Sequence, residues 1–132
     1  LKGYGIKAGA VALSIAHDSH NIIVVGVSDE EMEFAVNSLI AQEGGMVLVR
    51  EGKVLESMPM PIAGLMSDQS GEWVDEKLTA IHAKAYEELG IAGDVEPVMT
   101  LCFMSLAVIP EVKLTDMGLF DVTTFSFIPV EA

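Results

Sequence analysis

Cysteine, histidine and positive charge are all scarce in this sequence. Its 132 residues include one cysteine, three histidines and seven lysines and arginines. A single cysteine excludes an internal disulfide framework. Its place in the apolar segment Met99–Ile109 predicts that Cys102 is a buried, unreactive thiol rather than a nucleophile. This cysteine usage is typical of the reducing cytoplasm, where we expect the protein to reside.

The shortage of basic residues narrows the range of partners. Twenty acidic residues oppose seven basic ones, which gives a formal net charge of −13. An electrostatic field of that sign repels phosphate groups, so we expect neither nucleic acid nor an anionic membrane as a partner. No apolar run approaches the roughly 20 residues that cross a bilayer. The chain begins at Leu1 without a signal-peptide pattern, so we expect a fragment or a processed product.

The composition is that of one folded domain, spanning residues 1–132. Apolar residues make up 51% and charged residues 20% of the chain, as in globular proteins. Methionine is frequent, with eight residues. We expect most of them to fill the core and a few to line a surface toward another domain. Three glycines in Gly3–Gly9 predict a loop or edge strand that another backbone approaches closely.

The pattern of apolar residues predicts several short strands and two helices. Ser28, with Glu31 three positions later, is typical of a capping box at the start of a helix. A second helix is expected from about Gly71 to Leu89, and Val98–Ile109 fits either a buried helix or a strand. Strands are expected at 10–16, 21–27, 46–50, 53–58 and 123–130.

These elements predict an α+β fold. Short connections between strands favour antiparallel pairing. We therefore expect a mostly antiparallel sheet of about five to six strands, with the helices packed on one of its faces. Lys113–Gly118 has the composition of a turn, and the charges of Glu111, Lys113 and Asp116 are expected to be solvated there.

The densest group of chemically active side chains lies between the first two predicted strands, at residues 17–21. Two of the three histidines lie within this segment. A histidine beside a carboxylate is typical of acid–base chemistry, because the carboxylate fixes the imidazole tautomer and tunes its pKa. The candidate catalytic residues are His17, Asp18 and His20, and the candidate pocket or interdomain residues are Ser19 and Asn21.

Other interpretations of this cluster stay open. A self-contained metal site is disfavoured, because His17 and His20 would point to opposite faces of a strand and His82 is expected at the edge of the core. The serine of the cluster lacks the strand–turn–helix setting of a nucleophile elbow. The alternative to a site is a turn whose polar side chains, from Asp18, Ser19 and Asn21, bond their own backbone.

Four segments of the chain carry a family likeness. They are Ile6–Ala10, Ala16–Gly26, Pro61–Ser67 and Ile109–Leu119. In this order, and over essentially the whole chain, they resemble the C-terminal domain of bacterial adenine deaminase, of the amidohydrolase superfamily. The resemblance implies a parent hydrolase of purine salvage that converts adenine and water into hypoxanthine and ammonia. It also implies a (β/α)₈ barrel in which divalent manganese or iron activates water.

The chain departs from such a complete enzyme. It has no His-x-His pair, and its 132 residues are too few for a barrel, which needs at least about 200. The resemblance therefore implies no cofactor in this chain and makes the barrel of the same protein its main partner. The cluster at 17–21 is expected to face the barrel mouth and to help close or order the purine pocket.

Two further function classes are kept beside this one. In the first, the cluster only fixes a contact, and the domain is a non-catalytic assembly module that joins copies in a homo-oligomer through its methionine-rich face. In the second, the chain is a free-standing regulatory domain that binds purines. This second class is disfavoured, because the sequence places no group of aromatic residues near His17.

Overall fold

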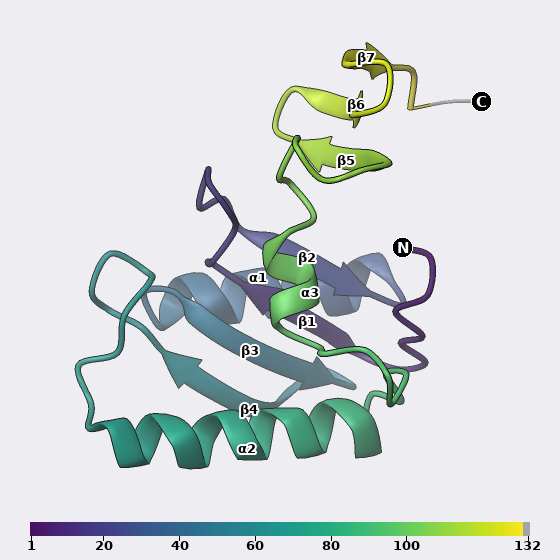
Figure 1. The fold of residues 1–132 in the computed structure, drawn as a ribbon. Helices are drawn as coiled ribbons and strands as arrows, with labels where there is room; N and C mark the ends of the chain where they lie inside the picture. Colours follow the sequence, from purple (N-terminus) through teal and green to yellow (C-terminus); the bar gives the residue numbers. More distant parts are fainter. Residues whose placement is uncertain (131–132) are drawn as a thin grey trace.

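Two antiparallel sheets form the fold, which is described by a computed structural model for residues 1–130 (Figure 1). The larger sheet has the strand order β2-β1-β3-β4 and the smaller one the order β5-β6-β7. The strands are β1 Ala10–Leu13, β2 Ile23–Gly26, β3 Gly45–Arg50, β4 Lys53–Pro59, β5 Val112–Thr115, β6 Gly118–Asp121 and β7 Ser126–Ile128. The helices are α1 Asp29–Ala41, α2 Gly71–Glu87 and α3 Met99–Cys102. The predicted α+β class is confirmed, with seven strands in two sheets rather than five to six in one.

Helices cover both faces of the larger sheet, so the expectation of one covered face is wrong. The reason is visible in β1, where all four residues are fully buried. Side chains alternate between the faces of a strand, so a fully apolar strand needs cover on both sides. Ala10 and Ala12 pack in the cluster that contains Leu39 of α1, whereas Val11 and Leu13 pack in the cluster of α2.

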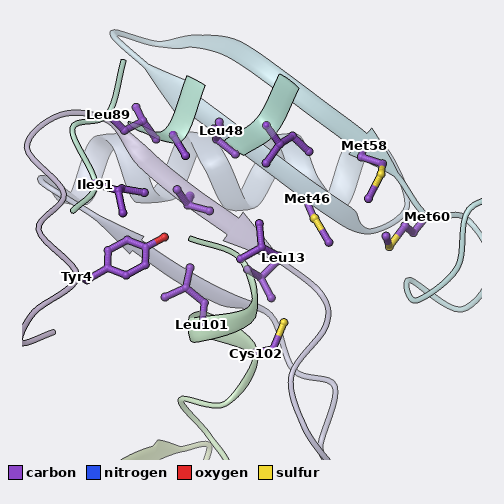
Figure 2. Packing of buried hydrophobic residues seen from close by; sticks show 14 residues of the cluster. Tyr4, Leu13, Met46, Leu48, Met58, Met60, Leu89, Ile91, Leu101 and Cys102 are labelled. Carbon is purple, nitrogen blue, oxygen red and sulfur yellow. The ribbon is translucent and has the colours of Figure 1, made fainter. Parts of the chain in front are cut away.

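The main core lies between the larger sheet, α2 and α3 (Figure 2). Tyr4 reaches into it and is 2% exposed, and its hydroxyl donates a hydrogen bond of 2.7 Å to the carbonyl oxygen of Pro97. Burial, and then the negative charge of Glu96, raises the pKa of the Tyr4 phenol. Met46, Met58 and Met60 are buried in the core, and Met66, Met99 and Met117 are exposed.

The glycine-rich lead meets another backbone at Gly9, as its sequence predicts. Gly9 has a φ of +64°, and a Cβ at this position would lie 2.0 Å from the carbonyl oxygen of Val49 in β3. No side chain fits that distance, so glycine is required where the chain enters β1.

Local signals define the start of α1 and the β3–β4 turn. The hydroxyl of Ser28 accepts the N–H of Glu31 at 3.3 Å, as predicted for the cap. The other half of the capping box is absent, because the Glu31 carboxylate accepts the N–H of Glu51 at 2.6 Å instead. Glu51 and Gly52 have φ values of 53° and 68°, the left-handed pair expected of a tight hairpin.

The C-terminal third differs most from expectation. Lys113–Gly118 is a turn only at Asp116 and Met117, because Lys113–Thr115 pair with β6 as part of strand β5. Lys113 is only 7% exposed, so the prediction of a solvated charge at this position is wrong. Its side chain lies on a sheet face beside its cross-strand partner Phe120. The ambiguous segment Val98–Ile109 contains the short helix α3 followed by turns. The last predicted strand is confined to Ser126–Ile128, and residues 131–132 of the single predicted domain lie outside the described residues.

Candidate functional site

The predicted cluster lies in the connection between β1 and β2. This loop projects on the same side of the larger sheet as the smaller sheet does (Figure 1). β1 ends earlier than predicted, at Leu13, because the side chain of Ser14 takes over the hydrogen bonding. The Ser14 hydroxyl accepts the N–H of Gly45 at 2.8 Å and donates to the carbonyl oxygen of Gly64 at 2.5 Å. Through Ser14, the root of the loop is tied to Pro61–Ser67, another of the segments that carry the family likeness.

His17 is the anchor of the loop. Its N–H donates to the carbonyl oxygen of Cys102 at 2.8 Å, and its own carbonyl oxygen accepts the hydroxyl of Ser105 at 3.4 Å. The imidazole stacks on the ring of Phe103, with centroids 5.0 Å apart and planes 18° from parallel. Three successive contacts thus hold one half-buried residue against the segment that leads into the smaller sheet.

The tip of the loop carries exposed polar side chains. Asp18, Ser19 and His20 are exposed, and Asn21 is half-buried. The turn is closed by the main chain, through the N–H of His20 and the carbonyl oxygen of Ala16. Within residues 1–130, the side chains of Asp18, Ser19 and Asn21 make no hydrogen bond to the loop's own backbone, so the alternative of a turn closed by these side chains is wrong. The ring centroids of His17 and His20 lie 6.1 Å apart.

His17 also lines a cavity of about 380 Å³. The walls come from the β1–β2 loop, β3, α2 and the segment around α3, and most of them are apolar. The lining residues are Ile15, His17, Met46, Leu78, His82, Glu96, Val98, Met99, Cys102 and Phe103. The structure therefore brings His17 and His82 to the same cavity, whereas Asp18, Ser19 and His20 lie outside its lining.

His82 and Glu96 form the polar corner of this cavity. His82 Nε2 lies 2.6 Å from Glu96 Oε1, an ion pair when the imidazole is protonated. The buried Nε2 has no aligned hydrogen bond, and the other carboxylate oxygen of Glu96 accepts the N–H of Met99. Sequence reasoning placed His82 at the core edge and missed this pairing. The available signal was helical spacing, because His82 follows Leu78 by four positions on the cavity side of α2.

The donor set does not fit a catalytic metal. A catalytic zinc-type site uses three protein ligands, and among the described residues no three His, Cys, Asp or Glu side chains lie close enough together to hold an ion. Cys102 lines the cavity, but burial, and then the charge of Glu96, raises the pKa of its thiol. A protonated thiol is a poor ligand and a poor nucleophile.

In residues 1–130, no helix is both long and apolar enough to cross a membrane.

Comparison with known proteins gives one consistent family. The family model described as adenine deaminase C-terminal domain matches residues 1–126. "Adenine deaminase 2" of Desulfotalea psychrophila is 75% identical over all of this chain, which spans 23% of that protein. "Adenine deaminase" of Halalkalibacterium halodurans is 53% identical over 97% of the chain and 22% of its own length. The chain thus spans under a quarter of the length of the curated relatives it matches, and it belongs to the adenine deaminase C-terminal domain family.

Proposed function

We propose that this domain is part of an adenine deaminase that converts adenine and water into hypoxanthine and ammonia, and that its β1–β2 loop helps to close the purine pocket. The relatives that share the whole domain are named adenine deaminase, which supports the reaction. The observation that supports this role is that the loop is held firmly at His17, whereas the residues at its tip are exposed. His17 is held by three contacts, and Asp18, Ser19 and His20 beyond it are exposed.

The two parts of the loop have different roles in this proposal. His17 positions the loop through its stack on Phe103. His20 donates a hydrogen bond to a ring nitrogen of the purine or to a neighbouring loop, and Asp18 orients that imidazole. A site at a boundary between domains suits such a pocket, because each domain supplies one wall. Asn21 and Ser19 line the same boundary.

The chemistry of water activation belongs outside this chain. No metal ligand set is found among residues 1–130. We place a divalent manganese or iron centre in the barrel domain of the same protein and expect no cofactor in this chain. Purine salvage in the cytoplasm is the setting that we propose for the parent enzyme, since a single buried thiol suits a reducing compartment. The strong negative charge keeps nucleic acid and anionic membranes out of the proposed set of partners.

The test uses the full-length protein of which this domain is part. His20→Gln and Asp18→Asn remove the proposed contacts, and Asp75→Asn removes an exposed carboxylate from α2 as a matched control. We expect kcat/KM for adenine to fall at least tenfold in the two loop variants, with metal content and melting temperature unchanged, and the control to behave like the unmodified protein. Full turnover in both loop variants would show that the loop has no part in the reaction.

A second function, an assembly module without direct chemistry, is favoured by one observation. Exposed apolar side chains gather on the smaller sheet, where Leu114 is 61% and Met117 is 77% exposed. Under this alternative, the loop variants retain activity and the chain forms homo-oligomers through that sheet. Sedimentation of the full-length protein at several concentrations, with and without a charge introduced at Leu114, separates the two functions.

A further inference from the structure

We infer that the apolar outer face of the smaller sheet is the surface on which the preceding domain of the same polypeptide docks. This inference rests on the proposed function only in taking the chain as one domain of a longer adenine deaminase. It concerns β5–β7, which carry none of the candidate catalytic residues.

One face of this sheet carries an apolar row that crosses all three strands. Leu114 of β5 is paired with Leu119 of β6, and Leu119 is paired with Ile128 of β7. Residues paired directly across antiparallel strands share a face. Val112 lies two positions before Leu114 and therefore on that same face. Leu114 is 61% and Val112 is 46% exposed, while Leu119 and Ile128 are partly exposed.

The opposite face of the sheet carries an aromatic cluster. Phe120 meets the rings of Phe125 and Phe127 edge-on, each with centroids 5.2 Å apart. Lys113 lies beside Phe120 and is 7% exposed. The two faces differ in chemistry. One carries the aromatic cluster, in which Phe125 and Phe127 are 75% and 52% exposed, and the other carries the aliphatic row, with Asp121 at its edge as the partner of Val112.

A sheet of this size needs a partner for its apolar face. Its strands are four, four and three residues long. Isolated hairpins of this length are marginally stable, and a third strand or an apolar face packed against another element adds to the stability. In residues 1–130, neither α1 nor α2 packs on this sheet, which stands away from the body of the molecule (Figure 1). An element that covers the aliphatic row would therefore come from outside the described residues.

The preceding domain is the occupant that the geometry favours. The matched family is a C-terminal domain, and the chain is 23% of the length of its Desulfotalea relative, so in a protein of that length most of the polypeptide lies before Leu1. Leu1 and Met104 line one cavity, and the carbonyl oxygen of Met104 accepts the N–H of Leu114 at 3.2 Å. Leu1 therefore lies near the segment that leads into β5. A domain joined to the chain at Leu1 is held at high effective concentration near this surface.

The smaller sheet and the β1–β2 loop project from the same side of the molecule (Figure 1). The hydroxyl of Ser105 donates a hydrogen bond to the carbonyl oxygen of His17. Phe103, two residues earlier in the chain, stacks on the His17 ring. The segment that leads into β5 is therefore the same one that anchors the loop.

The experiment is hydrogen–deuterium exchange on the full-length protein, read by mass spectrometry over residues 112–128. We expect these amides to be protected at least tenfold over an unstructured peptide, equally at low and high protein concentration. Leu114→Glu should lose that protection, because it places a charge in the interface. Ile40→Glu, which changes a residue of α1 that is 58% exposed, is the matched control and should not lose it.

Two other outcomes of this experiment overturn the inference. Unprotected amides in the unmodified protein would show an uncovered sheet, and this result does not depend on whether the variant folds. Protection that grows with protein concentration would assign the face to a second copy of the chain. Hydrogen exchange does not measure catalysis, so the two proposals fail separately. If the loop variants are fully active but residues 112–128 are protected, the proposed role of the loop is refuted and the inference about the docking face is kept.

Discussion

The imidazole of His17 lies nearly parallel to the phenyl ring of Phe103, with centroids 5.0 Å apart and planes 18° from parallel. This contact joins the loop between the first two strands to the segment that follows α3. Together with the backbone bond from His17 to Cys102, it fixes the position from which the exposed residues of the loop project. The half-buried histidine thus has a positional role that its exposed neighbours lack.

Variants of His17 test whether this residue only holds the loop in place or also takes part in the reaction. His17→Ala removes the stack and should lower the free energy of unfolding by about 1 kcal/mol, the usual contribution of an aromatic pair. His17→Phe keeps a flat ring against Phe103 and should restore that stability. We expect His17→Phe to keep most of the deaminase activity of the full-length protein, measured beside urea unfolding of both variants. If His17→Phe is stable but inactive, the ring nitrogens of His17 take part in the reaction.

Much of this fold could be predicted because its signals are local. The turn Glu51-Gly52 defines its hairpin with two adjacent residues, and the cap at Ser28 needs only the following turn of helix. The error at Lys113 has a different origin. Its burial depends on pairing with Phe120 and on the aromatic rings around it, which are relations between strands that no short window of sequence contains.

The candidate site, too, could be predicted from the sequence only where its residues are neighbours in the chain. The cluster at 17–21 was visible because its residues are adjacent in the chain, and its exposure at a strand connection follows from the flanking apolar runs. The cavity was not visible, because it joins His17 to His82 on α2 and to Glu96 before α3. Only the packing of α2 and α3 against one sheet face brings these distant positions together.

A second prediction concerns Tyr4. Its hydroxyl donates to the carbonyl oxygen of Pro97 inside the core, so Tyr4→Phe leaves a buried acceptor without a partner. An unpaired buried acceptor costs about 1–3 kcal/mol, and we expect that loss in the free energy of unfolding. Tyr86→Phe is the matched control, because the Tyr86 hydroxyl bonds Val95 where water can replace it in part. Equal losses in the two variants would contradict the importance of burial at Tyr4.

A third prediction concerns pH and Glu56. Burial acts to raise the pKa of its carboxyl, but hydrogen bonds from Lys77 and the N–H of Ser57, with the charge of Lys77, lower it by more. Because the folded pKa is depressed, the carboxylate stabilises the fold fully above the unfolded value of about 4.3. That contribution is lost as the pH falls through the lower, folded pKa.

The variant that tests this is Glu56→Gln. Glu56 forms ion pairs with both Lys77 and Lys84, and all three side chains are only partly exposed. At pH 7 the variant should therefore be less stable than the unmodified protein by about 1 kcal/mol. The difference in the free energy of unfolding should shrink as the pH is lowered below 4. Glu33→Gln, at an exposed position of α1, should show little difference at either pH. A constant difference from pH 7 to pH 3 would assign the effect to packing rather than to charge.

The last prediction concerns the only thiol. Cys102 is 5% exposed, and burial, followed by the negative charge of Glu96, raises its pKa. Reaction with thiol reagents needs both access and the thiolate, so at pH 8 we expect labelling in the native protein at least 100-fold slower than in denaturant. Thr79→Cys adds a thiol on the exposed side of α2, and one equivalent of label should then react at once. Rapid labelling of the unmodified native protein would mean that the cavity beside Cys102 opens to solvent, and that the thiol is available for chemistry there.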